Sequence, residues 1–336
     1  MVEIGVLGVG EWGKNHARVY RELENSNLVM VADLSGMRLK KLNKTYKVAV
    51  TNDYHDILNN PEIEAVSVCT PSSTHFEIVK QCLEAGKHVL VEKPLCLDSV
   101  SAQKLIDISE KHNKILMVGH IFRFNPAVRK LKDEIGKDNF GRIFFLYGSR
   151  MGLRTPRDDC GVIFDFALHD FDVFCFLLND FPIEVTAIGT PYLREPYEDV
   201  GIVTLRFPNN ILAHIQVSWL TPKKIRDLWV VGQEKSASLD YMSQDIEIYD
   251  IGVAPEYDSF GGFKLITREG DTYKPYIQNL EPLKLELAHF LECVENKKQP
   301  LTDGKGGLQV IKIIEATYKS IKEKKTVNLR EECGSS

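Results

Sequence analysis

The feature that most constrains the fold is a glycine-rich loop near the start of the chain, Gly8-Val9-Gly10-Glu11-Trp12-Gly13. It follows a short apolar run at 4–7 and precedes a helical pattern at 14–24. In such a loop the first glycine permits a tight turn, the second lets the backbone approach a pyrophosphate, and the third lets the helix pack closely. The free N–H groups at the start of the helix then donate to the phosphates. The loop therefore predicts dinucleotide binding, with Gly8, Gly10, Glu11, Trp12 and Gly13 at the cofactor.

An acidic residue at the expected distance supports this prediction. Asp33 ends a second apolar run at 28–33 and lies twenty residues after Gly13. A carboxylate at this position accepts hydrogen bonds from the adenosine ribose and repels a 2′-phosphate, so NAD is predicted over NADP. Arg38 leaves NADP as the alternative, although it falls within a solvated helical pattern rather than directly after the strand.

The first third of the chain alternates β-branched apolar runs with helical patterns. Strands are expected at 4–7, 28–33, 65–70, 88–92 and 115–118, and helices at 14–24, 37–44, 75–85 and 99–111. Nearly continuous apolar strands separated by helices are typical of a parallel sheet covered on both faces. Residues 1–121 are therefore predicted to form a doubly wound α/β domain.

The pattern changes after residue 122. Helical patterns at 126–135 and 163–178 are followed by strands without helices between them, at 183–192, 201–207, 211–218, 226–231, 237–240, 246–249 and 263–267. This succession favours a large, mostly antiparallel sheet. Helices at 282–296 and 307–324 close the chain, so residues 122–336 are expected to form an α+β substrate-binding domain. The last helix could pack back on the first domain.

A second polar group, Glu92-Lys93-Pro94, ends the strand at 88–92. Ligands of open parallel sheets bind beyond the carboxyl ends of the strands, so Glu92 and Lys93 are expected where a nicotinamide would sit. Proline restricts the preceding residue to extended backbone and so fixes the direction of Lys93. Without the glycine loop, a surface ion pair would explain this tripeptide better. With it, Lys93 is a candidate for proton transfer or for polarising a carbonyl.

Asp165 and His169 are four residues apart and would share one face of a helix. A carboxylate that holds one imidazole nitrogen leaves the other free to accept a hydroxyl proton as hydride departs from the same carbon. A satisfied polar pair in an apolar core is the alternative. We predict catalytic roles for Lys93, Asp165 and His169, and the sequence leaves open whether Lys93 or His169 is the base.

The remaining candidates are arginines, one histidine and one amide. His75, after Thr70 and Pro71, is expected either to line the cofactor loop or to cap the following helix. Arg123 and Asn125 lie where the first domain passes into the second and are predicted substrate contacts. Arg150, Arg154 and Arg157 are expected to follow a strand and could receive a phosphate, or could simply be solvated.

Charge and composition exclude other classes. The formal charge of -5 and the lack of a long basic block argue against nucleic acid as a partner. The longest apolar runs, 143–147 and 173–178, are far shorter than the ~18 residues of a membrane span, and no signal-like segment precedes the first strand. Seven cysteines without a CxxC pair or zinc spacing predict free thiols and no metal site. A cytoplasmic protein is expected.

Together these motifs resemble the glucose-fructose oxidoreductase/inositol dehydrogenase (Gfo/Idh/MocA) family over nearly the whole chain. The matching segments are GVGEWGKNHA, CTPSSTH, EKP, GHIFRFNP, the Asp165/His169 pair and DGKGGLQVIKIIEATYKS. The resemblance implies a Rossmann domain, a C-terminal open sheet that also mediates oligomerisation as a homodimer or homotetramer, and NAD(P)-dependent oxidation or reduction of a sugar-like group. It implies catalytic roles for Lys93, Asp165 and His169, and cofactor contacts for Gly8, Gly10, Gly13, Asp33, Thr70, Pro71, His75 and Glu92.

Within the family, the segment RFNP at 123–126 is most similar to the UDP-N-acetyl-sugar 3-dehydrogenases. The expected reaction is oxidation at C3 of a UDP-N-acetylhexosamine such as UDP-N-acetylglucosamine. Ser72 stands where many relatives carry Asn, and Cys160-Gly161 stands where a glycine pair is common. An inositol or free-sugar dehydrogenase and a non-catalytic NAD-binding regulator are the alternatives.

Overall fold

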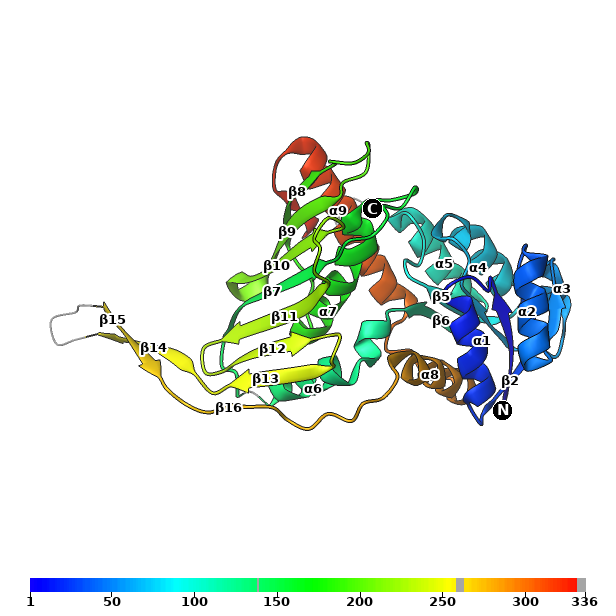
Figure 1. The fold of residues 1–336 in the computed structure, drawn as a ribbon, viewed down its shortest axis with the longest axis horizontal. Helices are drawn as coiled ribbons and strands as arrows, with labels where there is room; N and C mark the ends of the chain where they lie inside the picture. Colours follow the sequence, from blue (N-terminus) through cyan, green and yellow to red (C-terminus); the bar gives the residue numbers. More distant parts are fainter. Residues whose placement is uncertain (138, 258–262, 331–336) are drawn as a thin grey trace. The chain divides into compact units, whose positions relative to one another are not determined.

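The computed structural model describes residues 1–137, 139–257 and 263–330 (Figure 1). The chain divides into two compact units, the first made of residues 1–124 and 280–312 and the second of 125–279 and 313–336. Helix α9, Gly304–Glu323, begins in the first unit and ends in the second. None of the six cysteines in the described part of the chain forms a disulfide, and Cys333 lies outside the described residues.

The first unit is built on a six-stranded parallel sheet in the order β3-β2-β1-β4-β5-β6. Its strands are β1 (Val2–Leu7), β2 (Ser26–Ala32), β3 (Ala49–Thr51), β4 (Ala65–Val68), β5 (His88–Glu92) and β6 (Leu116–Gly119). Its helices are α1 (Gly13–Glu22), α2 (Gly36–Tyr46), α3 (His55–Asn59), α4 (His75–Glu84), α5 (Ser99–Lys111) and α8 (Pro282–Asn296), with short 3-10 turns at η1 (Ser72–Thr74) and η2 (Ile121–Phe124). The strand order reverses between β1 and β4, which is where doubly wound sheets bind ligands.

Helices on both faces explain why the central strands are apolar at nearly every position. Every residue of β4 is buried, and so are the three central residues of β5. Successive side chains of β1 enter different cores, with Val6 in one cluster and Leu7 in the other. The predicted doubly wound parallel sheet is confirmed. Strand β3 and helix α3 went unpredicted because they are too short to show a period.

Helix α8 belongs to the first unit, although the sequence-based division placed everything after residue 122 in the second. Leu283, Leu287 and Phe290 pack in the same core cluster as Ile4 and Val6. Each buried side chain of this size contributes roughly 1.5–3 kcal/mol. The sequence predicts the apolar stripe of α8, but a stripe does not reveal which sheet it covers.

The second unit is built on a nine-stranded sheet in the order β16-β13-β12-β11-β7-β10-β9-β8-β17. Its strands are β7 (Ile143–Met151), β8 (Glu184–Thr190), β9 (Val200–Phe207), β10 (Ile211–Ser218), β11 (Ile225–Gly232), β12 (Ser236–Asp240), β13 (Asp245–Tyr249), β16 (Thr272–Tyr273) and β17 (Val327–Asn328). The neighbours are antiparallel except for β7 and β10, which confirms the predicted mostly antiparallel sheet. Strands β14 (Gly252–Tyr257) and β15 (Phe263–Arg268) pair separately as a ribbon (Figure 1).

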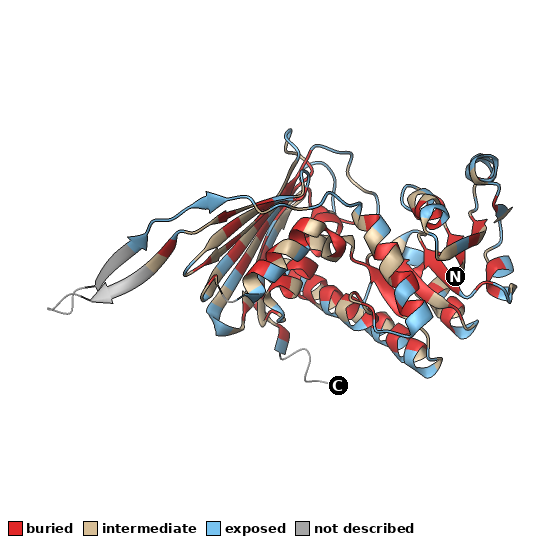
Figure 2. Ribbon diagram, turned by 90° about the horizontal axis from the view of Figure 1, so that it is seen from below, coloured by how far each residue is buried: buried red, intermediate tan, exposed pale blue. Residues whose placement is uncertain are grey.

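The two faces of the nine-stranded sheet differ (Figure 2). Helices α6 (Pro126–Gly136) and α7 (Leu168–Leu178) cover one face, where Leu146 and Val230 are buried. The other face carries a row of stacked aromatic side chains, in which Phe145, Tyr147, Trp229 and Tyr249 follow one another with ring centroids 5.8, 5.9 and 5.5 Å apart. None of the helices in the described part of the chain is long and apolar enough to cross a membrane.

The predicted helix at 163–178 consists of two different segments. Residues Ile163–Ala167 form one π-helical turn, η3, and α7 begins at Leu168. Glu198 accepts a hydrogen bond from the Ile163 amide at 3.0 Å and another from the Tyr318 hydroxyl at 3.0 Å. Single π turns within helices often mark functional sites. Here the turn carries Asp165 and ends two residues before His169.

Candidate functional site

The glycine loop lies at the carboxyl end of β1. Gly8 has a φ of +83°, and a Cβ there would lie 2.8 Å from the Cys69 carbonyl oxygen. A Cβ at Gly13 would lie 1.8 Å from the Gly8 carbonyl oxygen, so only glycine lets α1 begin this close to the strand. At Gly10 a Cβ would meet only the Arg38 guanidinium among the described atoms, 4.0 Å away. The loop backbone is therefore open to a ligand at Gly10 and closed by packing at Gly13.

Asp33 is held directly beside this loop. Its carboxylate accepts hydrogen bonds from the Val9 amide and the Ser35 amide, each at 2.7 Å. Arg38 approaches the same carboxylate at 3.5 Å, and its own side chain is 58% exposed. The acid predicted to bind the ribose is thus fixed by two backbone donors, and an exposed guanidinium lies next to it.

These residues fit NAD. Trp12 at the amino end of α1 makes no side-chain cap, and Trp12 and Glu11 are both exposed. The first N–H groups of this ten-residue helix are therefore left for phosphate oxygens. Together with the open backbone at Gly10 and the fixed carboxylate of Asp33, they supply what a dinucleotide needs at a strand-order reversal.

Glu92 is tied to a buried histidine that the sequence analysis did not single out. His16 Nε2 lies 2.9 Å from the Glu92 carboxylate, and His16 Nδ1 lies 3.2 Å from the Ser67 hydroxyl. Tyr20 continues the chain of contacts to Ser67 at 2.7 Å. His16 is fully buried on the face of α1 that also buries Ala17, so a polar side chain at an apolar helix position was the available signal.

His75 links the two loops that follow β4 and β5. Its Nδ1 lies 2.7 Å from the Pro94 carbonyl oxygen and its Nε2 lies 2.9 Å from the Thr70 carbonyl oxygen. Burial lowers the pKa of His75, because its effect is larger than that of the two carbonyl contacts, which by themselves would raise the pKa. A neutral ring donates to one carbonyl at a time. The alternative that His75 caps the following helix is wrong, because its ring contacts these two carbonyl groups and makes no cap of α4, of which it is the first residue. Its contact with the cofactor stays a prediction.

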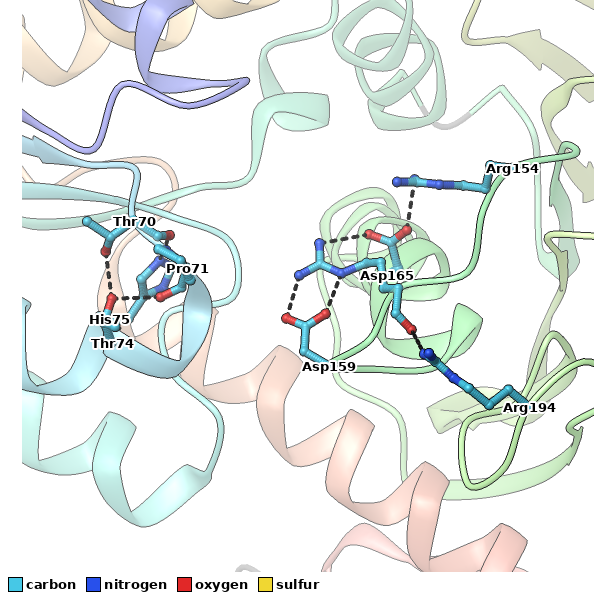
Figure 3. A network of polar contacts seen from close by, with 9 residues as sticks. Thr70, Pro71, Thr74, His75, Arg154, Asp159, Asp165 and Arg194 are labelled. Atoms are coloured by element: carbon cyan, nitrogen blue, oxygen red, sulfur yellow. Dashed lines mark hydrogen bonds and ion pairs between the residues drawn. The ribbon is translucent and has the colours of Figure 1, made fainter. Parts of the chain in front are cut away.

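The loop after β4 is also held by hydrogen bonds within itself (Figure 3). The Thr74 hydroxyl donates to the Thr70 hydroxyl at 2.9 Å and approaches the Pro71 carbonyl at 2.8 Å. In the next loop, Lys93 is half-buried and the Lys93–Pro94 peptide is cis. Thr70 and Pro71 follow the carboxyl end of β4, while Glu92 ends the adjacent parallel strand β5 and Lys93 follows it.

In the second unit, Asp165 is a buried carboxylate contacted by arginines (Figure 3). Arg154 donates to it at 3.0 Å, and Arg157 lies 3.7 Å away. Arg157 also holds Asp159 through two hydrogen bonds of 2.8 and 2.7 Å, and these raise the pKa of Arg157 above its usual value. Half-buried His169 follows on the first turn of α7, and its pairing with Asp165 stays a prediction.

Two residues expected to meet substrate are held in structural contacts. Arg150 lies within β7, 3% exposed, and binds Asp170 through hydrogen bonds of 2.6 and 3.1 Å, so the expectation that it is a loop residue open to phosphate is wrong. Asn125 is buried and caps α6, because its side-chain oxygen accepts from the Ala127 amide at 2.9 Å. In the first unit, Arg123 donates to the Leu301 carbonyl at 3.2 Å.

No group of three or more His, Cys, Asp or Glu side chains in the described part of the chain could hold a metal ion.

Comparison with known proteins agrees with this geometry. Residues 2–120 match the Gfo/Idh/MocA oxidoreductase family with its NAD-binding Rossmann fold, and residues 150–329 match the C-terminal α/β domain of the same family. The chain belongs to this family. The Gfo/Idh/MocA resemblance, the NAD-binding domain and the assignment as a dehydrogenase acting on CH–OH groups are confirmed.

Similar Gfo/Idh/MocA proteins differ in substrate. UDP-N-acetylglucosamine 3-dehydrogenase of Acidithiobacillus ferrooxidans is 28% identical over 308 residues, covering 91% of this chain and 93% of that protein. Its solved structure matches with a TM-score of 0.83 at 25% identity, covering 96% and 98% of the two chains. Myo-inositol 2-dehydrogenase of Thermotoga maritima is 26% identical over 354 residues, covering 99% and 100%. The family is shared, and the substrate differs between these relatives.

Proposed function

We propose that this dehydrogenase oxidises the C3 hydroxyl of a UDP-N-acetylhexosamine, such as UDP-N-acetylglucosamine, with NAD as the oxidant. The observation that carries the proposal is the similarity, over nearly the full length of both chains, to a UDP-N-acetylglucosamine 3-dehydrogenase. The segment Arg123-Phe124-Asn125-Pro126 supports the same subgroup.

The cofactor residues have separable tasks. Gly8, Gly10 and Gly13 let the backbone approach the pyrophosphate, and Asp33 accepts hydrogen bonds from the ribose. Glu92, fixed by His16, and Thr70 and Pro71, linked to the next loop through His75, shape the nicotinamide end. Bound NAD supplies a hydride acceptor.

The reacting hydroxyl loses a proton while its carbon loses hydride, so the chain must supply a base. Lys93 and His169 are the candidates, and either can take this proton as a nitrogen base. Asp165, fixed by Arg154 and Arg157, positions the substrate or the imidazole. The group that does not act as the base donates a hydrogen bond to the developing oxyanion.

The test is the formation of NADH from UDP-N-acetylglucosamine by the wild-type protein and by Lys93→Met and His169→Ala. We expect turnover in the wild type and a loss of roughly 100-fold or more in both variants, because general acid–base groups contribute about 10²–10⁴-fold. Arg206→Met, on β9, serves as the matched control with full activity. Retained turnover in both active-site variants would overturn the assigned roles.

Inositol oxidation is the second candidate function, because the Thermotoga myo-inositol 2-dehydrogenase matches the whole chain. A thermal-shift screen in the presence of NAD separates the two. A UDP-N-acetylhexosamine should raise the melting temperature, whereas inositols and free hexoses should not. If inositols raise the melting temperature and the UDP-N-acetylhexosamine does not, the substrate is a polyol, and the roles proposed for the active-site residues are unchanged.

A further inference from the structure

An arginine cluster lies beside the rings of Phe166 and Tyr241 in the second unit. We use this name for Arg150 on β7, Arg154 in the loop after β7, and Arg226 near the start of β11. The Arg226 guanidinium lies 4.4 Å from the centre of the Phe166 ring, and that of Arg154 lies 5.7 Å from it. Arg226 and Arg150 are directly opposite each other in the β7–β11 ladder. The guanidinium groups of Arg226 and Arg154 thus lie close to one aromatic ring next to Asp165, and that of Arg150 lies 4.9 Å from the centre of the Tyr241 ring.

The charges of this cluster do not balance. Arg150 is paired with Asp170, and Arg154 is paired with Asp165. Arg226 donates only to backbone carbonyl groups, those of Met151 and Ile225, and has no ion pair with any residue the structure describes. Two carboxylates therefore face three guanidinium groups, and the excess charge belongs to Arg226.

The position of Arg226 makes this excess costly. Burial, followed by the charge of the neighbouring Arg150, lowers the pKa of Arg226 to about 10. A half-buried cation surrounded by an aromatic ring and other cations is stabilised when an anion binds to it. The cluster is thus better suited to a negatively charged ligand than to water.

The unused edge of Arg226 has the geometry for an oxyanion. Both hydrogen bonds of the Arg226 side chain are donated by Nη1, which has two protons, so the edge formed by Nε and Nη2 has no partner among the described residues. This edge presents two parallel N–H groups and binds carboxylate or phosphate oxygens in a bidentate manner. Arg154 is 45% exposed and makes one hydrogen bond to Asp165, so it keeps further donors for the same ligand.

We propose that Arg226, together with Arg154, binds the diphosphate of a nucleotide-sugar substrate. The inference rests on the proposed function and specifies which residues recognise the nucleotide part. A neutral polyol or free hexose has no group that would compensate the Arg226 charge, whereas a diphosphate does. A sugar carboxylate offers the same oxyanion chemistry, and the experiment separates these two sources.

The experiment compares Arg226→Met and Arg226→Lys with the wild type. Arg206→Met is the matched control, because Arg206 is on the same sheet but pairs with Glu184. In Arg226→Met we expect the KM for UDP-N-acetylglucosamine to rise about 10- to 100-fold while kcat changes by about twofold or less, because a bidentate charged contact far from the reacting carbon is lost. The KM of Arg226→Lys should lie between those of the wild type and Arg226→Met, and the KM of Arg206→Met should equal that of the wild type.

Inhibition identifies the anion. UDP should compete with the substrate in the wild type and about 10-fold less well in Arg226→Met, whereas glucuronate should compete poorly with both. Equal inhibition by UDP in folded wild-type and variant proteins would overturn the proposal. Strong inhibition by glucuronate that is lost in the variant would assign the cluster to a sugar carboxylate instead.

Failure of the proposed function would look different. If the wild type oxidises an inositol and no UDP-sugar, the substrate assignment fails, and binding of UDP is then measured by thermal shift. A UDP-induced shift that Arg226→Met abolishes would still support the anion site, and no shift in either protein would end it. The melting temperature of Arg226→Met without ligand shows whether it folds, and we expect little loss because the removed cation has no ion pair.

Discussion

At the scale of single residues, we predict that Asp33 determines which dinucleotide the first unit prefers. Replacing Asp33 with Ala removes the acceptor for the ribose hydroxyls and also the charge that repels a 2′-phosphate. We expect the KM for NAD to rise about 10- to 100-fold and the KM for NADP to fall, since exposed Arg38 is left to meet the phosphate. Steady-state kinetics with both cofactors measure this, and an unchanged preference would contradict the role of Asp33.

His16 is predicted to be a positioning residue that acts through Glu92. His16→Phe removes the 2.9 Å contact and leaves the Glu92 side chain without its buried partner. We expect kcat/KM for NAD to fall about 10-fold, with partial recovery in His16→Gln, which can still donate to the carboxylate. His55→Gln, at an exposed histidine, is the control. If His16→Phe lowers only the melting temperature and leaves the kinetics unchanged, the role of His16 is purely structural.

His88 gives the fold a defined dependence on pH. Burial, followed by the charges of Lys114 and Lys297, lowers the pKa of His88 to about 4, while its Nδ1 accepts a hydrogen bond from the Ile115 amide. Since the unfolded chain has a pKa near 6.5, it binds the proton first as the pH falls. The stabilisation is complete above about pH 6.5 and is lost toward about pH 4. His88→Gln should therefore lose melting temperature less steeply over this range, and parallel curves would contradict the argument.

The sequence predicts functional residues only when they belong to a motif with a characteristic spacing. Gly8, Gly10, Gly13 and Asp33 belong to one spaced motif, and their places at the carboxyl ends of β1 and β2 agree with it. His16 and Arg226 belong to no such spacing. Their importance comes from burial and from which partners they have or lack, and those properties exist only after distant segments have packed.

At the scale of elements, the π turn η3 depends on Gly161. A Cβ at Gly161 would lie 2.1 Å from the Glu198 carboxylate oxygens, which hold the Ile163 amide. We expect Gly161→Ala to lower the free energy of unfolding by about 2–4 kcal/mol and to reduce activity, because Glu198 must move and Asp165 is on the same turn. Denaturant unfolding measures the change.

Gly136→Ala is the matched control for this element. A Cβ at Gly136 meets nothing within 4 Å, so the substitution should leave stability unchanged or raise it slightly. If Gly161→Ala and Gly136→Ala have the same free energy of unfolding, the Glu198 carboxylate does not need the space left by the missing Cβ of Gly161.

Elements with strong periods are the ones that the sequence predicts well. The bounds 88–92, 99–111, 211–218 and 282–296 coincide with β5, α5, β10 and α8. The π turn was predicted as ordinary helix, because the shift of one hydrogen-bond register leaves no trace in hydrophobic spacing. The parallel pairing of β7 with β10 was not predicted either, since pairing direction depends on contacts between separate segments.

At the scale of the whole molecule, self-association through the aromatic face of the nine-stranded sheet is our prediction. Phe145 and Leu212 are directly paired across β7 and β10, and their side chains are 39% and 38% exposed. We expect a homodimer or homotetramer, and Phe145→Glu with Leu212→Glu should give monomers, because opposed carboxylates would be buried without partners. Light scattering measures the mass, with Lys40→Glu and Lys41→Glu as the control. A wild-type monomer would contradict this prediction.

The discontinuous composition of the first unit has a consequence for biosynthesis. Its sheet emerges from the ribosome early, yet the leucines and the phenylalanine of α8 in its core are translated only after eight of the nine strands of the second unit's sheet. Until residue 296 has been translated, the apolar surface that α8 covers in the first unit is therefore exposed and prone to aggregation. The first unit contains the first residues to be synthesised, yet it can complete its folding only after its second segment, which begins at residue 280, has been translated.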